Sequence, residues 1–241
     1  DLFTAEYVHG KTGLDKKGDP IIVSSDYKVE DQNAIDFIVD TCKSSTDQIY
    51  LCPTGPLTNI ALSLQKDPSI KEKIKEIVFM GGAAMCLGNT TPSAEFNIFV
   101  DPHAANIVFN SGVKIIMLGL DVTHKVLVDD NIIKEISLIG NKSSVFFKNL
   151  IDFYSIFHKK KYQTSSSPLH DPCVIGYILQ PEIFIGKFTN VIVEETSKLT
   201  MGQTIVDWLE VTDRKKNCIV INDVDSNIFF RLLKEKFTNL P

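Results

Sequence analysis

Two aspartates precede apolar segments in the same way, but only one of them follows a histidine. "LHDP" ends at Pro172, and "VDPH" begins at Val100. In each, aspartate is a favoured helix N-cap, and proline suits the first helical position because its missing N–H would be unpaired there. An N-cap carboxylate keeps lone pairs for a further partner. The pattern predicts two helix starts and leaves open whether Asp171, beside His170, also binds something.

A second polar pair, Glu95 and Asn97, occurs in "SAEFNIFV". If this stretch is extended, both side chains point to one side and Phe96 points to the other. A carboxylate only accepts hydrogen bonds whereas an amide also donates them, so the pair can hold neighbouring hydroxyl groups. A solvent-facing strand edge explains the pattern equally well. Asn89, in the loop before, either reaches the same place or makes a turn.

The elements that must position these residues alternate from residue 48 onward. Strand-like apolar runs occur at 48–52, 76–80 and 113–121, with helical patterns between them. This alternation predicts parallel strands with right-handed crossovers, flanked by helices. Further helices are expected at 129–140, 144–162, 172–179 and 225–237, and further strands, as an antiparallel edge or flap, at 190–195, 204–211 and 217–223. We expect one α/β domain over residues 1–241.

Three polar or glycine-containing turns follow the first three expected strands. They are Thr54-Gly55, Met80-Gly81-Gly82 and the segment 121–124. Ligands of parallel α/β sheets bind beyond the carboxyl ends of the strands. We therefore expect the three turns to meet at one rim, although a plain strand-to-helix turn also accounts for 53–59 by itself.

Composition excludes several classes of function. A net charge of −5 and a pI near 5.6 give no electrostatic reason to expect nucleic acid as a partner. No run of about eighteen apolar residues would span a membrane. The five cysteines are scattered, which argues against a disulfide framework and a structural zinc site and favours a reducing, cytoplasmic compartment. The phosphate-loop, dinucleotide-binding and G-x-S-x-G patterns are absent from the sequence.

Six motifs together resemble the inosine-uridine type of nucleoside hydrolase. In family order they are "HGKTGLD" (9–15), "PTGPLTNIAL" (53–62), "KEIVFMGGA" (75–83), "GNTTPSAEFNIFVDPHAANIVF" (88–109), "GLDVTHK" (119–125) and "LHDP" (169–172). The resemblance implies an open, mainly parallel sheet flanked by helices. It also implies hydrolysis of the N-glycosidic bond of ribonucleosides to ribose and free base, one bound Ca²⁺ ion, and a homo-oligomer of two or four copies.

The resemblance also assigns roles to individual residues. Asp171 would be a calcium ligand through its side chain and Thr54 through its backbone carbonyl. Residues that would contact the ribose are Glu95, Asn97, Asn89 and Met80. Residues that would face the base are His170, which would help it leave, and His9. Asp101 matches a position without a chemical role, so we expect it to act as a cap.

General chemistry agrees with these implied roles. Calcium takes six to eight oxygen ligands and lowers the pKa of a bound water. Cleavage of a glycosidic bond passes through an oxocarbenium-like state, which a carboxylate such as Glu95 stabilises. A histidine such as His170 supplies a proton near neutral pH.

Tyr154, His158 and Tyr162 recur at every fourth position of one expected helix. This spacing places the three side chains on one stripe of the helix. The stripe is either a lining for the base pocket or ordinary helix packing.

The sequence departs from the family at one motif. The aspartate-rich strand end D-x-D-x-G-x-D-D, which provides the family's other calcium carboxylates and the base for water, has no match here. We expect that an N-terminal segment with the first strand is missing, and that the chain alone is poorly stable. The alternative is a truncated relative that binds nucleosides without catalysis.

Overall fold

The chain forms two compact units, each assembled from separated segments. The computed structural model describes residues 3–10, 15–16, 19–20 and 28–241. Residues 30–125 and 170–224 form one unit, named here the sheet unit. Residues 1–29, 126–169 and 225–241 form the other, named the helical unit. The single domain expected over residues 1–241 stays a prediction.

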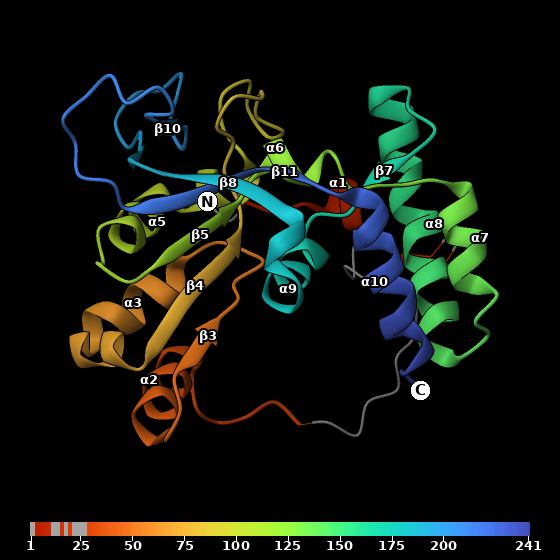
Figure 1. The fold of residues 1–241 in the computed structure, drawn as a ribbon, viewed down its shortest axis with the longest axis horizontal. Helices are drawn as coiled ribbons and strands as arrows, with labels where there is room; N and C mark the ends of the chain where they lie inside the picture. Colours follow the sequence, from red (N-terminus) through yellow and green to blue (C-terminus); the bar gives the residue numbers. More distant parts are fainter. Residues whose placement is uncertain (1–2, 11–14, 17–18, 21–27) are drawn as a thin grey trace. The chain divides into compact units, whose positions relative to one another are not determined.

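The sheet unit is built around five strands in the order β3-β4-β5-β11-β8 (Figure 1). Their bounds are β3 Ile49–Leu51, β4 Ile74–Met80, β5 Ile115–Leu118, β11 Cys218–Val224 and β8 Phe184–Thr189. The first four run parallel, and β8 pairs antiparallel with β11. The expected α/β fold with a mainly parallel sheet is confirmed.

The C-terminal strands differ partly from expectation. The 217–223 strand is not an outer flap, because β11 lies inside the sheet between β5 and β8. The edge is instead β8, which the sequence patterns did not indicate. The other two expected strands form a separate antiparallel pair, β9 (Val191–Val193) and β10 (Thr204–Val206).

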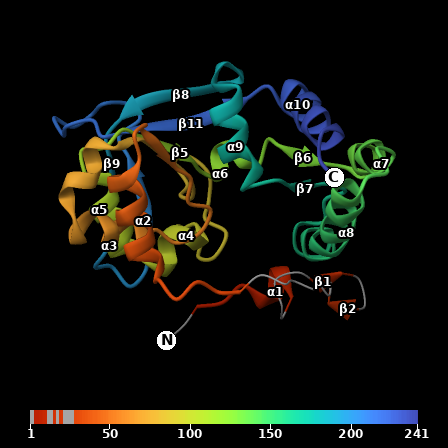
Figure 2. The ribbon, with the colours of Figure 1, turned by 90° about the horizontal axis from the view of Figure 1, so that it is seen from below.

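Helices cover both faces of the sheet (Figure 2). Alternate residues of β4 and β5, Ile77 and Ile115 among them, form one core with α2 (Ala34–Ser44), α3 (Thr58–Lys66) and α5 (Pro102–Phe109). The remaining strand residues, such as Val78, are also fully buried, and α9 (Pro172–Leu179) packs against β4. Short helices α4 (Phe96–Val100), α6 (Leu120–Thr123), η1 (Pro68–Glu72) and η2 (Pro181–Ile183) complete the unit.

The described residues of the helical unit form four helices and two short antiparallel strand pairs. The helices are α1 (Glu6–His9), α7 (Asp130–Ser137), α8 (Lys142–Tyr162) and α10 (Ser226–Thr238); the pairs are β1 (Asp15–Lys16) with β2 (Asp19–Pro20) and β6 (Leu127–Val128) with β7 (Ser167–Pro168). The side chains of Asp129, Asn141 and Asp225 cap α7, α8 and α10. The three helices expected here are confirmed.

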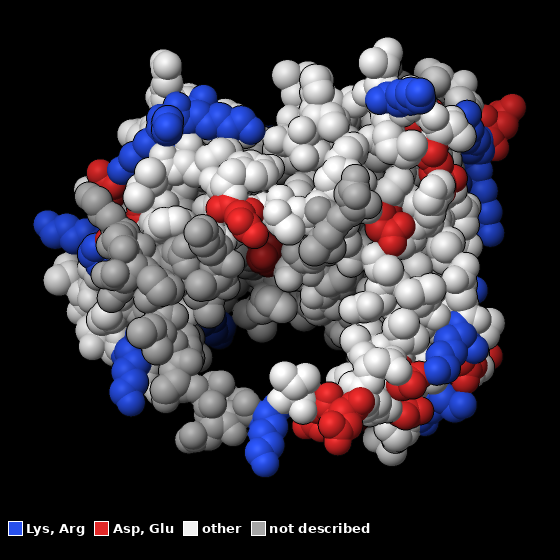
Figure 3. All heavy atoms as spheres, turned by 180° about the vertical axis from the view of Figure 1, so that it is seen from behind, with Lys and Arg blue, Asp and Glu red and all other residues white. Residues whose placement is uncertain are grey.

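On the face drawn in Figure 3, lysines and arginines lie in several separate groups, and so do aspartates and glutamates. No helix in the described ranges is long and apolar enough to cross a membrane.

Candidate functional site

The turns after β3, β4 and β5 are joined by backbone hydrogen bonds. The amide of Met80 donates to the Pro53 carbonyl at 3.1 Å, and the amide of Leu120 donates to the Gly82 carbonyl at 2.9 Å. Glycine is required at position 119, because a Cβ there would lie 2.6 Å from the Gly82 oxygen. The expected meeting of the three turns at one rim is confirmed.

Glu95 is buried at this rim and caps a helix. Its side chain is 2% exposed, and Oε2 accepts hydrogen bonds from the amides of Gly82 and Asn97, both at 2.9 Å. The extended conformation expected for 94–98 is wrong, since α4 begins at Phe96. Burial raises the pKa of Glu95 to about 7, although the amide hydrogen bonds act in the opposite direction.

Asn97 links Glu95 to the ends of β3 and β4. Its Nδ2 donates to the Met80 carbonyl at 3.0 Å and to the Thr54 carbonyl at 3.4 Å. Asn97 is only 8% exposed, so little water competes for these hydrogen bonds, and they fix the orientation of its amide group. The structure thus brings four of the expected site residues into direct contact, with the helix start, not strand alternation, positioning the polar pair.

Asn89 closes the loop that precedes this helix. Its Oδ1 accepts a hydrogen bond from the amide of Phe96 at 2.9 Å. The turn-forming role is therefore present, and it places Asn89 against the same helix start that Glu95 caps. A ribose contact for Asn89 stays a prediction.

His170 is held through its ring by a buried threonine. Its Nδ1 is hydrogen-bonded to the Thr123 hydroxyl at 2.8 Å, and Thr123 is fully buried. The ring of His124 lies 5.7 Å from that of His170, centroid to centroid. The sequence placed 121–124 at the rim but gave no signal for this contact, which joins residues 47 positions apart.

Asp171 does not cap α9. It has helical dihedral angles, φ −63° and ψ −37°, and its side chain makes no cap hydrogen bond, so the expected capping role is wrong. The residue is open to solvent on part of its surface, while the protein surrounding the carboxyl group raises its pKa to about 6. The charge of Asp171 also contributes to the raised pKa of Glu95.

Asp101 caps its helix as expected. Its Oδ1 accepts the amide of Ala104 at 3.0 Å, and Oδ2 accepts the Thr58 hydroxyl at 2.6 Å. Both oxygens are therefore used in joining α5 to α3.

The aromatic stripe of α8 lies in the helical unit. Its rings follow one another, with centroids 4.4 Å apart for Tyr154 and His158 and 5.5 Å apart for His158 and Tyr162. His9 stacks on Tyr154 at 5.8 Å, and burial lowers the pKa of His9. The packing role is present, and the base-pocket role stays a prediction. Residues 11–14 of the motif "HGKTGLD" lie outside the described residues.

Comparison with known proteins decides the family. The family model described as inosine-uridine preferring nucleoside hydrolase matches residues 1–231. The chain belongs to this family of enzymes. It is 43% identical over 237 residues to the pyrimidine-specific ribonucleoside hydrolase RihA of Salmonella gallinarum, a match that covers 98% of this chain and 75% of the relative.

Solved nucleoside hydrolases share the fold. A purine-preferring ribonucleoside hydrolase from Gardnerella vaginalis is 34% identical, with a TM-score of 0.87 over 97% of this chain and 73% of that one. A plant nucleoside hydrolase, PpNRh1, is 28% identical, with a TM-score of 0.89 over 99% of this chain and 76% of that one.

The oxygen atoms at this edge of the sheet are of the kind that a hard cation such as calcium binds, but there are too few of them to complete its coordination. Asp171 offers a carboxylate without a hydrogen bond among the described residues, and Thr54 offers a carbonyl. Calcium needs six to eight oxygens. No group of three or more His, Cys, Asp or Glu side chains in the described ranges could hold a metal ion. The described residues therefore form at most part of a calcium site.

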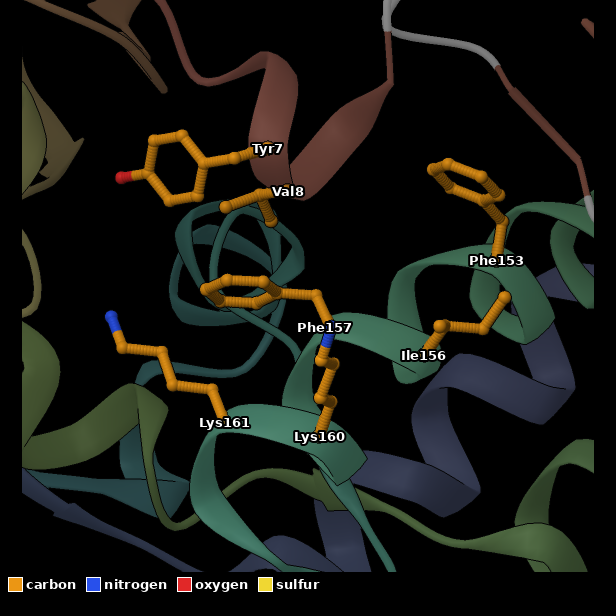
Figure 4. Close-up of a pocket in the computed structure, with 7 residues that line it drawn as sticks. All are labelled: Tyr7, Val8, Phe153, Ile156, Phe157, Lys160 and Lys161. Carbon is orange, nitrogen blue, oxygen red and sulfur yellow. The ribbon is translucent and has the colours of Figure 1, made fainter.

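A pocket of about 510 Å³ lies within the helical unit of this family member (Figure 4). Its walls are side chains of α1 and α8: Tyr7, Val8, Phe153, Ile156, Phe157, Lys160 and Lys161. The rings of Tyr7 and Phe157 meet edge to face at 5.5 Å. The pocket is mainly apolar, with two lysines from the last turn of α8.

Proposed function

We propose that this protein hydrolyses the N-glycosidic bond of ribonucleosides, giving ribose and a free base, with a calcium-bound water as the nucleophile. The observation that carries the proposal is the polar rim of the sheet. Asn97 joins the carbonyls of Thr54 and Met80 there, Glu95 is buried beside it, and the carboxylate of Asp171 is left without a hydrogen-bond partner among the described residues.

Glu95, Asn97, Asn89 and Met80 would contact the ribose. The Nδ2 of Asn97 is used in holding the two strand ends, so its Oδ1 is the atom turned to the sugar hydroxyls. Glu95 is fixed by backbone amides before any substrate arrives. A carboxylate held in this way stabilises positive charge on the sugar without having to reorganise.

His170 would supply the proton that the departing base needs. The Thr123 hydroxyl is hydrogen-bonded to Nδ1, and Nε2 would be the nitrogen that donates the proton. When the imidazolium releases its Nε2 proton, Nδ1 would keep its own proton and donate it to the Thr123 hydroxyl before and after the transfer.

Asp171 and the carbonyl of Thr54 would hold the calcium ion together with oxygen ligands from outside the described residues, because two donors fall short of the coordination that calcium requires. When bound, the ion would lower the pKa of a water molecule and so provide the nucleophile.

His9 and Tyr162 would contact the base. The relatives are named for different bases, pyrimidine-specific in one case and purine-preferring in the other. Both inosine and uridine are therefore test substrates.

A homo-oligomer of two or four copies and a cytoplasmic location stay predictions. The cytoplasmic location is supported by five cysteines that are all unbridged.

The test is base release from inosine and uridine, measured with calcium and after treatment with a chelator. We expect release of at least one base, lost with the chelator and restored by calcium. Turnover that is unchanged by exhaustive removal of metal would contradict the calcium-dependent mechanism.

A second candidate is a protein that binds nucleosides without cleaving them. It is favoured by one observation, the lack of a three-ligand group of acidic or imidazole side chains in the described part of the chain. Saturable binding of inosine or uridine with no base release in the presence of calcium would decide for this candidate.

A further inference from the structure

Asp121 holds the loop that leads from β4 towards Asn89. Its carboxylate accepts hydrogen bonds from three consecutive amides: Ala84 to Oδ2 at 2.6 Å, and Met85 and Cys86 to Oδ1 at 2.8 and 3.1 Å. Both oxygens are needed for this arrangement. An asparagine would offer one acceptor and turn an N–H₂ group towards a donor.

At its start the loop is also held by Thr204, whose hydroxyl accepts a hydrogen bond from the amide of Ala83 and donates one to its carbonyl. Met85 and Leu87 are 58% and 77% exposed, so burial of apolar side chains contributes little to its conformation. Asp121 itself is fixed, because it lies in α6, whose first residue donates its amide to the Gly82 carbonyl. The Asp121 carboxylate therefore ties the loop that follows β4 to the end of the neighbouring strand β5.

Only a few closely packed residues separate the segment that Asp121 holds from Asn89, the residue proposed to bind the ribose. Cys86 stands three positions before Asn89. Between them, the amide of Gly88 donates to the Pro92 carbonyl at 3.1 Å, and a Cβ at position 88 would lie 2.3 Å from the Ala94 oxygen. These contacts of Gly88 connect the segment held by Asp121 to the turn that carries Asn89.

We propose that Asp121 is a positioning residue for ribose recognition, acting through residues 84–88 on Asn89. The inference rests on the proposed function, since it assigns Asn89 a hydroxyl of the sugar. Asp121 does not touch the substrate in this scheme. Its loss weakens substrate binding more than it slows bond cleavage.

The test is a double-mutant cycle of Asp121→Asn with Asn89→Ala in the calcium-loaded protein. Asp121→Asn should raise KM about tenfold with a smaller change in kcat, and the double variant should resemble Asn89→Ala alone, because coupled residues are not additive. Effects that multiply, or a loss confined to kcat, would overturn the inference.

Asp101→Asn is the matched control. It also removes a carboxylate that accepts an amide and a second donor, but at the start of α5, and its KM should equal that of the wild type. If Asp121→Asn fails to fold, Asp121→Glu keeps two acceptor oxygens displaced by one methylene group and is carried through the same cycle.

Hydrogen exchange separates this inference from the proposed function. In Asp121→Asn the amides of residues 84–86 should exchange faster than in the wild type, and unchanged exchange would overturn the inference whatever the activity. A wild-type protein that neither binds nor cleaves nucleosides would instead contradict the proposed function, and the ribose role of Asp121 with it.

Discussion

The starts of α5 and α9 share an Asp-Pro sequence and use the aspartate in opposite ways. Asp101 has both carboxylate oxygens engaged, one with the amide of Ala104 and one with the Thr58 hydroxyl. Asp171 makes no cap hydrogen bond. A partly exposed carboxylate whose pKa is raised by the surrounding protein, and which has no compensating hydrogen bond, is unfavourable for the fold when it is ionised. The difference shows that Asp101 stabilises its helix, and it supports the proposal that Asp171 binds a ligand.

Backbone conformation explains the difference. Asp101 has φ −145° and ψ 77°, a non-helical conformation from which a side chain reaches the first turn. Asp171 is already helical, and the amides of Cys173 and Val174 are satisfied by the carbonyls of His170 and Asp171. Because the first turn of α9 needs no side-chain cap, the carboxylate is directed elsewhere.

The largest expected effect is that of Asp171→Ala on the calcium-loaded enzyme. Removal of this proposed metal ligand should lower base release by more than about 100-fold, since even the partners of metal ligands are worth 10- to 100-fold. Retained calcium should fall in parallel, as measured by metal content after gel filtration. A variant that keeps both calcium and full activity would show that Asp171 is not a ligand.

His170→Ala tests the neighbouring residue. It should slow base release by about 10²- to 10⁴-fold, the usual contribution of a general acid, and leave the metal content unchanged. A riboside with p-nitrophenol as leaving group needs no proton and should lose much less activity. Equal losses on both substrates would argue against proton donation by His170.

Thr123→Val should have a smaller effect of the same kind. It replaces the hydroxyl at Nδ1 of His170 with a methyl group and should lower turnover of nucleosides about tenfold, whereas Thr123→Ser should restore it. Steady-state kinetics of both variants provide the measurement. A serine variant as slow as the valine variant would indicate that packing matters there and the hydroxyl does not.

The pH dependence of stability should also distinguish the two aspartates in calcium-free protein. The folded-state pKa of Asp171 is raised to about 6, above the usual value near 3.9. Ionised Asp171 therefore destabilises the fold fully above about pH 6, and this destabilisation disappears as the pH falls to about 4. Comparing wild type with Asp171→Ala by urea unfolding at several pH values should show a difference that shrinks in this window. A constant difference would contradict the raised pKa.

The sequence predicted the elements whose apolar patterns are long and regular. The runs that became β3, β4, β5 and β11 were recognisable, as were helices α7, α8 and α10 of the helical unit. Strand β8 was missed because Gly186 and Lys187 interrupt its apolar pattern; yet glycine is needed at 186, where a Cβ would lie 2.6 Å from the Val220 carbonyl oxygen. Helix α4 has five residues, too few to show a helical period.

The candidate site was predictable where a motif resembles the family and unpredictable where distant residues meet. Glu95, Asn97, Met80 and Thr54 were expected together and do contact one another. The contacts of Asp121 with residues 84–86 and of Thr123 with His170 join segments more than 30 positions apart. No local spacing signals such pairs. The Asp-Pro pattern likewise does not specify the dihedral angles that separate Asp171 from Asp101.

The most direct test of the different roles of the two aspartates is the free energy of unfolding of Asp101→Ala and Asp171→Ala, measured side by side at pH 7 with a chelator. Asp101→Ala should lose about 1 kcal/mol, the usual effect of removing a cap. Asp171→Ala should lose nothing, and gain at most about 1 kcal/mol because solvent screens a partly exposed carboxylate. Equal losses in both variants would contradict the account, because Asp171 would then stabilise its helix as Asp101 does.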